Sequence, residues 1–281
     1  ARCDHGVMSQ VSRFYTGPGG LVAAISSAFD AAGLDRSTLR PADLAPVDEF
    51  HIRGRAASLE IIEALGLTAD SHVLDLGSGL GGPARTLAEL TGCTVTGVDL
   101  TPEFCEVATA LSEWTGLSAR TRFRVGDATA TGLSDAAVDA ALSVHVAMNI
   151  SDKNALYAEA FRVLRPGGRF VVYDVLQGEG GDVLYPVPWA NDPSTSFLAT
   201  PQEMRELLPA AGFEITSEVD SSDESIVWFQ QVQARIQQDG PPPVTFATFL
   251  GKAFGQMAAN QVANLTERRI RTVMFACSRP T

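Results

Sequence analysis

The sequence predicts an α/β fold in which a parallel sheet is covered by helices on both faces. Strand-like and helix-like segments alternate from about residue 72 to 176, the pattern typical of such a sheet. The first strand runs into a glycine-rich turn that opens a helix. Hydrophobic residues make up 45% of the 281 residues and charged residues 19%, an ordinary globular balance.

Apolar runs bounded by turn signals define the strands of this alternating region. The expected strands are 72–77, 94–100, 122–127, 138–146 and 169–176, and the helices between them are 83–90, 102–114 and 153–164. The last helix is followed by Arg165-Pro166-Gly167-Gly168. Because proline cannot continue a helix and glycine allows the chain to reverse, we expect that helix to stop there.

The rest of the chain is less regular. A stretch rich in Gly, Pro and aromatic residues covers 177–197, and loops of this length usually act as lids or binding segments. Beyond it we expect a helix, 201–211, and two strands, 213–219 and 270–278, with helical stretches 222–239 and 245–265 inserted between those strands. The first 70 residues are helical in pattern at 21–32 and 50–65, around a polar, proline-bearing connection, and show no independent core. The expected domains are an N-terminal helical cap (1–65), a core (66–221 and 268–281) and a helical insertion (222–267) that contributes to a substrate cap.

The charge balance argues against nucleic acid or membrane as the main partner. The chain has 21 basic and 33 acidic residues, a formal net charge of −12, which repels phosphate backbones and anionic lipid surfaces. No apolar run approaches the roughly 18 to 20 residues of a membrane-spanning helix. The scattered cysteines form no close pair typical of a metal or redox site. We therefore expect a cytoplasmic protein with a small-molecule substrate and no metal, and leave a homodimer open.

The first strand-to-helix turn carries the strongest local signal. Its glycines at 77, 79 and 82 let the backbone turn tightly and approach a ligand, and the helix that follows presents unpaired amide groups. The spacing satisfies the dinucleotide pattern GxGxxG, which alone does not distinguish NAD from another nucleoside cofactor.

Three carboxylates at successive strand ends separate these cofactor types. Asp75 precedes the first glycine and could accept a hydrogen bond from a cationic amino group, whereas its charge would be unfavourable beside phosphates. Asp99 ends the second strand and could accept both ribose hydroxyls. Asp127 ends the third strand and could accept from an adenine amine. Together they suit a cationic, phosphate-free nucleoside, although each could instead be a helix N-cap or turn carboxylate.

The segments LDLGSGLGG (74–82), GVDL (97–100), GDA (126–128) and LRPGG (164–168) resemble the class I S-adenosylmethionine-dependent methyltransferases, over about residues 55 to 220. More narrowly, VDEFHIRGR (47–55), HVAMNISDK (145–153) and YPVPWANDPSTSFLAT (185–200) resemble the sarcosine and dimethylglycine N-methyltransferase-like group. The resemblance implies a Rossmann-like sheet in the order 3-2-1-4-5-7-6 with an antiparallel last strand and a helical cap. It also implies S-adenosylmethionine as cofactor and S-adenosylhomocysteine as product.

The resemblance further implies how the cofactor lies across the strand ends. The methionine part would lie on the glycine loop with Asp75 behind it, and Asp99 would take the ribose. Leu100 would cover the adenine face, with Asp127 and Ala128 at its edge. Tyr15 resembles an N-terminal tyrosine that folds over the cofactor, or belongs to a mobile tail. The cofactor-binding positions are thus Asp75, Gly77, Ser78, Gly79, Gly81, Asp99, Leu100, Asp127, Ala128 and Tyr15.

His145 ends the fourth strand, where the substrate and the methyl group meet in this family. It could orient the substrate or accept a proton, or it could be a structural residue. Met148 and Asn149 follow on the same loop and could contact substrate, with core filling as the alternative for Met148.

The remaining substrate candidates lie in two other segments. His51 and Arg53 begin a helix that could close over the site, and Arg53 could bind a carboxylate bidentately; the alternative is a solvated basic helix start. Tyr185 and Trp189 could line the mouth of the site, where an aromatic face stabilises a cation by about 0.5 to 2 kcal/mol, or could anchor the loop. The Phe and Met residues of 246–257 could be a packed stripe or a substrate box.

Our first hypothesis is N-methylation of an amino acid or amine such as sarcosine or dimethylglycine. Its alternative is C- or O-methylation of a specialised metabolite. A nicotinamide-dependent oxidoreductase would use the same glycine turn but would not need Asp75 and Asp127. A catalytically silent cofactor-binding protein also remains open.

Overall fold

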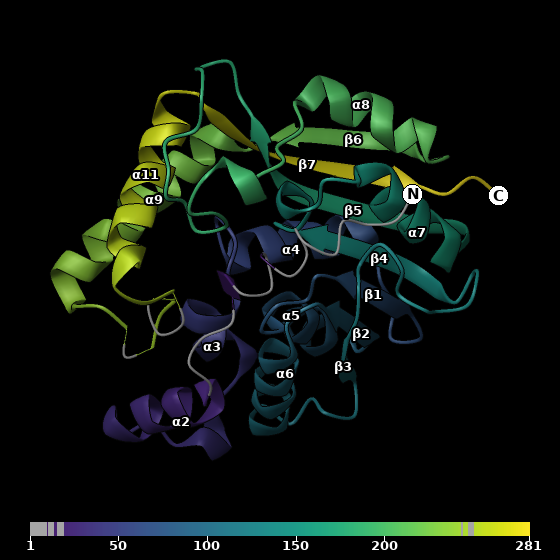
Figure 1. Ribbon diagram of the computed structural model, residues 1–281. Coiled ribbons are helices and arrows are strands. Elements are labelled where there is room, and N and C mark those ends of the chain that lie inside the picture. The colour runs from purple at the N-terminus through teal and green to yellow at the C-terminus, as the bar shows by residue number, and fades with distance from the viewer. Residues whose placement is uncertain (1–9, 11–13, 16–19, 243, 247–249) are drawn as a thin grey trace.

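The structure is a computed structural model that describes residues 10, 14–15, 20–242, 244–246 and 250–281. Within these residues, seven strands form one sheet in the order β3-β2-β1-β4-β5-β7-β6 (Figure 1). The β7 strand is antiparallel to both of its neighbours, and the other pairs are parallel. The strand order and the antiparallel last strand that the resemblance implied are thus confirmed.

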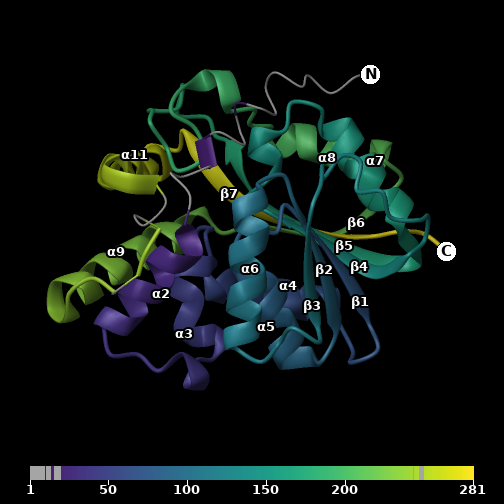
Figure 2. The same cartoon turned by 60° about the horizontal axis from the view of Figure 1, so that its bottom comes forward.

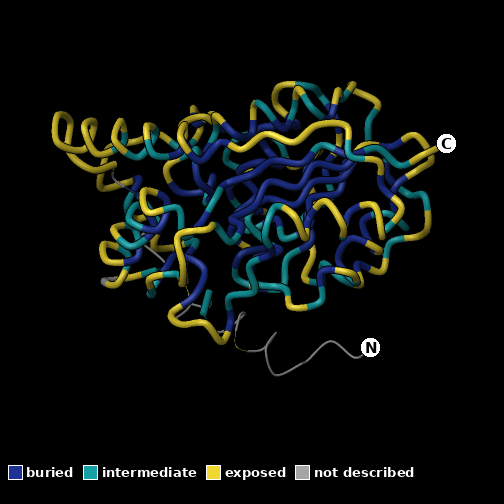
Figure 3. Tube along the Cα trace, turned by 90° about the horizontal axis from the view of Figure 1, so that it is seen from above, coloured by how far each residue is buried: buried dark blue, intermediate teal, exposed yellow. Residues whose placement is uncertain are grey.

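The inner strands are mainly apolar runs whose side chains are buried on both faces, as a parallel sheet between helices requires, whereas the two edge strands, residues 121–125 and 214–220, are largely exposed. Val73, Leu74 and Leu76, for example, are fully buried, and buried strands occupy the middle of the molecule in Figure 3. The strands are β1 (His72–Leu76), β2 (Thr94–Asp99), β3 (Thr121–Val125), β4 (Val138–Val144), β5 (Leu164–Gln177), β6 (Glu214–Asp220) and β7 (Ile270–Ser278).

Helices cover both faces of this sheet (Figure 2). The helices α4 (Arg55–Leu65) and α5 (Gly82–Thr91) pack with strand residues in one buried cluster. The helices α7 (Lys153–Val163) and α8 (Pro201–Ala210) pack with strand residues in a second cluster. The α6 helix (Pro102–Trp114) lies beside β3. Thr200 and Glu203 form a reciprocal capping box that fixes the start of α8.

The strand predicted to begin at 169 begins earlier, at Leu164. Leu164 already pairs with Val138 on β4, and a register shift between Val138 and Ala140 takes up the residues of the Arg-Pro-Gly-Gly reversal. The turn predicted to end the helix is therefore an irregular first part of β5, and α7 stops at Val163.

The N-terminal region differs from its prediction in two places. The helix predicted over 50–65 begins only at Arg55, because Arg53 and Gly54 have φ angles of 69° and 47°, which a right-handed helix excludes. The proline-bearing connection contains a helix, α3 (Pro41–Asp48). Proline at a first helical position loses no hydrogen bond, since that N–H has no partner inside the helix.

The first helices share a core with the rest of the molecule. Leu21, Ile25 and Phe29 of α2 (Leu21–Ala31) pack in one cluster with α3 and with Phe104 and Leu111 of α6. This explains why no independent N-terminal core was visible in the sequence.

Among the residues that the structure describes, the α-helices between β6 and β7 in the chain stand at the positions predicted for an insertion. They are α9 (Ser222–Asp239) and α11 (Phe254–Thr266), which lie side by side (Figure 1). The start of α11 is later than the predicted 245, and residues 247–249 lie outside the described part. None of the described helices has the length and apolar character needed to cross a bilayer.

Candidate functional site

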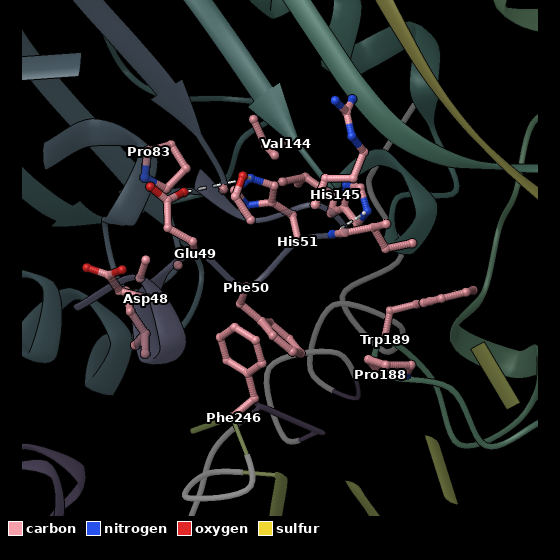
Figure 4. Close-up of a pocket in the computed structure, with 18 of the residues that line it drawn as sticks. Asp48, Glu49, Phe50, His51, Pro83, Val144, His145, Pro188, Trp189 and Phe246 are labelled. Atoms are coloured by element: carbon pink, nitrogen blue, oxygen red, sulfur yellow. Dashed lines mark hydrogen bonds and ion pairs between the residues drawn. The ribbon is translucent and has the colours of Figure 1, made fainter. Parts of the chain in front are cut away.

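A cavity of about 1280 Å³ opens at the carboxyl ends of the parallel strands, the edge where open α/β sheets bind ligands. It exceeds the roughly 300 to 1,000 Å³ of an ordinary small-molecule pocket, so it has room for two molecules side by side. One half lies over the glycine loop and the strand ends. The other half of the cavity is bounded by α9 and α11 and by the side chains of Phe50 and Phe246. The centres of these two rings are 4.7 Å apart (Figure 4).

The glycine loop is shaped by packing at two positions and is open at a third. A Cβ at Gly77 would lie 2.4 Å from a methyl group of Val146, and one at Gly81 would lie 2.6 Å from the Phe123 ring. Gly79 also has a positive φ, of 51°, but a Cβ there would meet nothing within 4 Å. The loop therefore turns tightly and leaves open space above Gly79 for a ligand.

Asp75 is 1% exposed, and its Oδ2 atom has no hydrogen-bond partner among the residues that the structure describes. Burial, together with the nearby charges of Asp99 and Glu49, raises the pKa of Asp75 to about 8. Ser78 Oγ, which is also buried and lines the same cavity, likewise lacks a described partner. Because buried polar atoms nearly always have partners, these two atoms fit the polar methionine end of the cofactor.

Asp99 is held in place by backbone amides. Its Oδ2 accepts a hydrogen bond from Gly79 N–H and its Oδ1 accepts one from Thr101 N–H, both at 2.8 Å. Burial raises the pKa of this carboxyl group. Each carboxylate oxygen still has accepting capacity, which suits two ribose hydroxyls. Leu100 lines the cavity next to it.

Asp127 and Ala128 line the same half of the cavity. Asp127 Oδ1 accepts hydrogen bonds from both the N–H and the hydroxyl group of Thr129, each at 2.8 Å. The carboxylate thus stabilises its own turn and faces the cavity as well, so the turn and the ligand interpretations are compatible.

His145 has both ring nitrogens engaged with the backbone. Nδ1 lies 3.3 Å from the Tyr173 carbonyl oxygen, and Nε2 lies 3.3 Å from the Ile52 N–H. These partners assign the proton to Nδ1 and leave Nε2 as the acceptor. Burial lowers the pKa of His145 to about 3, so the ring is neutral near pH 7 and helps to hold the segment around Ile52.

His51 also lines the cavity and is neutral. Its ring lies 5.9 Å from the His145 ring, and Nε2 donates to the Gly54 carbonyl oxygen at 2.9 Å. Burial lowers the pKa of His51 to about 4. Figure 4 shows the two imidazoles side by side at the centre of the cavity.

Arg53 lines the cavity, but its guanidinium group is already paired. Both of its Nη atoms donate to the carboxylate of Glu60, one of them at 2.8 Å. A substrate carboxylate would have to compete with Glu60 for this side chain.

Tyr15 and Asn149 both line the cavity and contact each other. The Tyr15 hydroxyl donates to Asn149 Oδ1 at 3.2 Å, while Asn149 Nδ2 donates to the carbonyl oxygens of Trp189 and Thr195. Asn149 therefore ties three separate segments together. Burial raises the pKa of the Tyr15 hydroxyl. Met148 lines the cavity, is 5% exposed and belongs to a buried cluster.

The structure brings Trp189 to the cavity but not Tyr185. Trp189 is 1% exposed, and its Nε1–H donates to Ser196 Oγ at 2.9 Å. Tyr185 packs against the buried cluster that contains Trp189 and is not among the described residues that line the cavity.

Two further groups of residues line the cavity, and only Phe246 and Phe254 among them were singled out in the sequence. The first is the adjacent pair Asp48 and Glu49, buried at the end of α3, whose pKa values burial raises, that of Asp48 to about 6. Asp48 pairs with Arg85 at 2.7 Å, and Glu49 accepts from Ser58 and Thr86. Asp48 and Glu49 are adjacent acidic residues in the segment VDEFHIRGR (47–55), so the sequence could have indicated them as site candidates.

The second group is the wall formed by the inserted helices. The α9 residues at positions 228, 232, 235 and 239 are spaced so that they lie on one face of the helix. This spacing could have identified them in the sequence as a group facing the same way. Its lining residues here are Trp228, Phe229, Val232, Arg235, Ile236, Asp239, Phe246, Phe254, Ala258 and Gln261.

Comparison with known proteins extends the resemblance. Residues 74–172 match the family described as "Methyltransferase domain". Sterol 24-C-methyltransferase erg-4 of Neurospora crassa is 28% identical over 183 residues, 62% of this chain and 48% of that protein. The chain thus spans about half the length of this curated relative.

Solved structures share the fold. Geranyl diphosphate C-methyltransferase from Streptomyces coelicolor, in complex with S-adenosyl-L-homocysteine, has a TM-score of 0.71 at 18% identity, covering 99% of this chain and 100% of that one. A putative sarcosine dimethylglycine methyltransferase from Galdieria sulphuraria has a TM-score of 0.63 at 17% identity, covering 80% and 83%. The narrower resemblance to the sarcosine group therefore rests on fold alone and stays a prediction. Residues 74–172 thus match a methyltransferase domain, and the chain has the fold of methyltransferases solved with S-adenosyl-L-methionine or S-adenosyl-L-homocysteine bound.

Proposed function

We propose that the chain is an S-adenosylmethionine-dependent methyltransferase that acts on a carbon or oxygen atom of a mainly apolar small molecule. The observation that carries this proposal is the apolar wall opposite the cofactor half of the cavity. Phe50, Trp228, Val232, Phe246 and Phe254 line that wall. Such a surface gains free energy by burying an apolar acceptor, and the charged residues of the same lining, Arg235 and Asp239, lie at exposed positions of α9.

In this proposal the cofactor occupies the half of the cavity above the strand ends. Asp75 and the amides of the glycine loop hold its methionine end, Asp99 binds the ribose, and the adenine lies between Leu100 and Asp127. The unpartnered Oδ2 of Asp75 and the open space above Gly79 support this orientation. The net charge of −12 supports a small-molecule acceptor rather than nucleic acid.

When bound, S-adenosylmethionine supplies a reactive methyl group on a sulfonium centre. The chain's own residues hold the acceptor in line with that group and exclude water, which can account for most of the rate of a displacement. His145 orients the segment around Ile52, since both of its nitrogens are engaged. The neutral His51 adds no positive charge beside the sulfonium, and its ring would take up the proton that a hydroxyl or carbon acceptor loses on methylation.

N-methylation of sarcosine or dimethylglycine is the second candidate. The VDEFHIRGR segment favours it, and Trp189 could stabilise a cationic amine at the cavity wall. However, a substrate carboxylate would have to compete with Glu60 for Arg53, the expected anchor. We therefore prefer the apolar acceptor.

A methyl-transfer screen distinguishes the two candidates. The protein is incubated with S-adenosylmethionine labelled in its methyl group and with alkylphenols and isoprenoid alcohols, or with sarcosine, dimethylglycine and simple amines, and the products are identified by mass spectrometry. We expect label only in the apolar set, with Asp99→Ala as the control that removes a cofactor contact. Labelled sarcosine or dimethylglycine, with a KM for that amine raised in Arg53→Ala, would establish the amine function instead.

A further inference from the structure

Gln261 is a buried polar residue on the apolar side of the cavity. It is 7% exposed and lines the cavity on the same face of α11 as Phe254 and Ala258, which precede it at helical spacing. No hydrogen bond joins its side-chain amide to any residue in the part of the chain that the structure describes. The amide atoms are not among the fully enclosed atoms without a partner, so the amide reaches the open cavity, where a ligand can bond it.

The other amide side chains near Gln261 on α11 have structural partners. Asn260 donates to the Pro186 carbonyl oxygen at 2.9 Å. Asn264 donates to the Leu184 carbonyl oxygen at 3.0 Å and accepts from the Leu184 N–H at 2.8 Å. These two asparagines hold the segment after β5 against α11. Gln261 makes no such contact, so its amide is not explained by the packing of the helix.

The chemistry of the amide indicates what would complement it. A glutamine side chain carries two N–H donors and one carbonyl acceptor, and can bond a hydroxyl or a carbonyl oxygen but gains nothing from a hydrocarbon. Trp228, Val232 and Phe254 supply the apolar surface around the same half of the cavity. A ligand that fills this space therefore needs an apolar body with a hydrogen-bonding oxygen directed at α11.

We propose that Gln261 determines acceptor specificity by hydrogen-bonding a hydroxyl or carbonyl oxygen of an otherwise apolar acceptor. This inference rests on the proposed function, since it narrows the acceptor class of the same cavity. Because a site built to bond an oxygen discriminates strongly against the analogue that lacks it, Gln261 separates oxygenated acceptors from hydrocarbons of the same shape.

The test uses a pair of probes that differ by one group, para-butylphenol and para-butyltoluene. Their dissociation constants are measured by calorimetry on the wild type, Gln261→Leu and Gln256→Leu, with S-adenosylhomocysteine present. Gln256 is a matched control because it is exposed on α11 and its amide bonds only Asn260. We expect the wild type and Gln256→Leu to prefer the phenol by roughly 5- to 10-fold, and Gln261→Leu to bind both probes about equally.

Two further measurements distinguish a role of Gln261 in acceptor specificity from a role in holding the structure together. Affinity for S-adenosylhomocysteine should be the same in all three proteins. The melting temperature of Gln261→Leu should be unchanged or higher, because the substitution breaks no hydrogen bond among the described residues and adds apolar surface beside Phe254 and Ala258. A lower melting temperature together with weaker S-adenosylhomocysteine binding would show a structural role and overturn the inference.

The inference and the proposed function fail in different ways. If Gln261→Leu keeps the wild-type preference, or if the wild type binds both probes equally, the role of Gln261 is wrong while the apolar acceptor stands. If neither probe binds the wild type although S-adenosylhomocysteine does, the apolar acceptor class is wrong and the role of Gln261 falls with it.

Discussion

At the scale of single residues, Asp75 connects cofactor binding to pH. Its folded-state pKa of about 8 lies far above that of an exposed aspartate, near 3.9. The folded state therefore holds this proton more tightly than the unfolded chain does. The contribution of Asp75 to the free energy of unfolding consequently falls as pH rises from about 4 to about 8. A cation placed against the carboxyl group favours its ionised form and releases the proton.

We expect the affinity for S-adenosylhomocysteine to increase with pH between about 5.5 and 7.5, because the ligand's ammonium group binds the ionised form of Asp75. Calorimetric titrations in buffers of different ionisation enthalpy should detect release of up to about one proton per site. Asp75→Asn should bind more weakly and without this pH dependence, whereas Asp70→Asn, at an exposed position, should behave as the wild type. A wild-type affinity that does not change over this range would contradict the role given to Asp75.

The positions of the aspartates could be predicted from the sequence, because each lies in or just after the carboxyl-terminal part of a strand and parallel strands end at a common edge. The hydrogen-bond and ion-pair partners of the other candidate site residues could not be predicted from the sequence. His145 meets Ile52, 93 positions away in the sequence. Arg53 is close in sequence to its partner Glu60, but no local pattern distinguishes a paired arginine from one that awaits a substrate.

At the scale of elements, the inserted helices show which properties of a helix a sequence pattern can predict. Helical spacing predicted both stretches of the insertion, and α9 has the predicted bounds. The pattern does not tell whether an apolar stripe packs on a core or faces a cavity, since both bury the same side chains. The structure brings Phe246 and Phe254 to the cavity, while Met257 is buried outside its lining.

The α9 helix allows the acceptor wall to be tested with two neighbouring positions. Val232 lines the cavity, and Gln233 is exposed on the outer side of the same helix. Val232→Asp should weaken binding of para-butylphenol by roughly 10-fold or more, because it places a charge in an apolar site. Gln233→Asp introduces the same side chain without this effect, and neither variant should change the affinity for S-adenosylhomocysteine. Equal probe affinities in both variants, measured by calorimetry, would mean that α9 does not form the acceptor wall.

At the scale of the whole molecule, the sheet and its cap were predictable to different degrees. The strand order was implied by the resemblance to the class I methyltransferases, and the structure confirms it. Which helices enclose the cavity could not be predicted, because its lining combines residues of α3, near the start of the chain, with residues of α9 and α11, near its end. The N-terminal helices have a core only together with α6, so their arrangement depends on packing that spacing does not encode.

The central claim is that the cavity holds the cofactor across the strand ends with its reacting centre facing the wall made by α9 and α11. A crystal structure of the protein with S-adenosylhomocysteine bound tests this most directly. We expect the ligand's ammonium group at Asp75, its ribose hydroxyls on Asp99, its adenine between Leu100 and Asp127, and its sulfur directed toward Phe50 and α11. Density that places the adenine elsewhere, or the sulfur away from the apolar wall, would contradict the account.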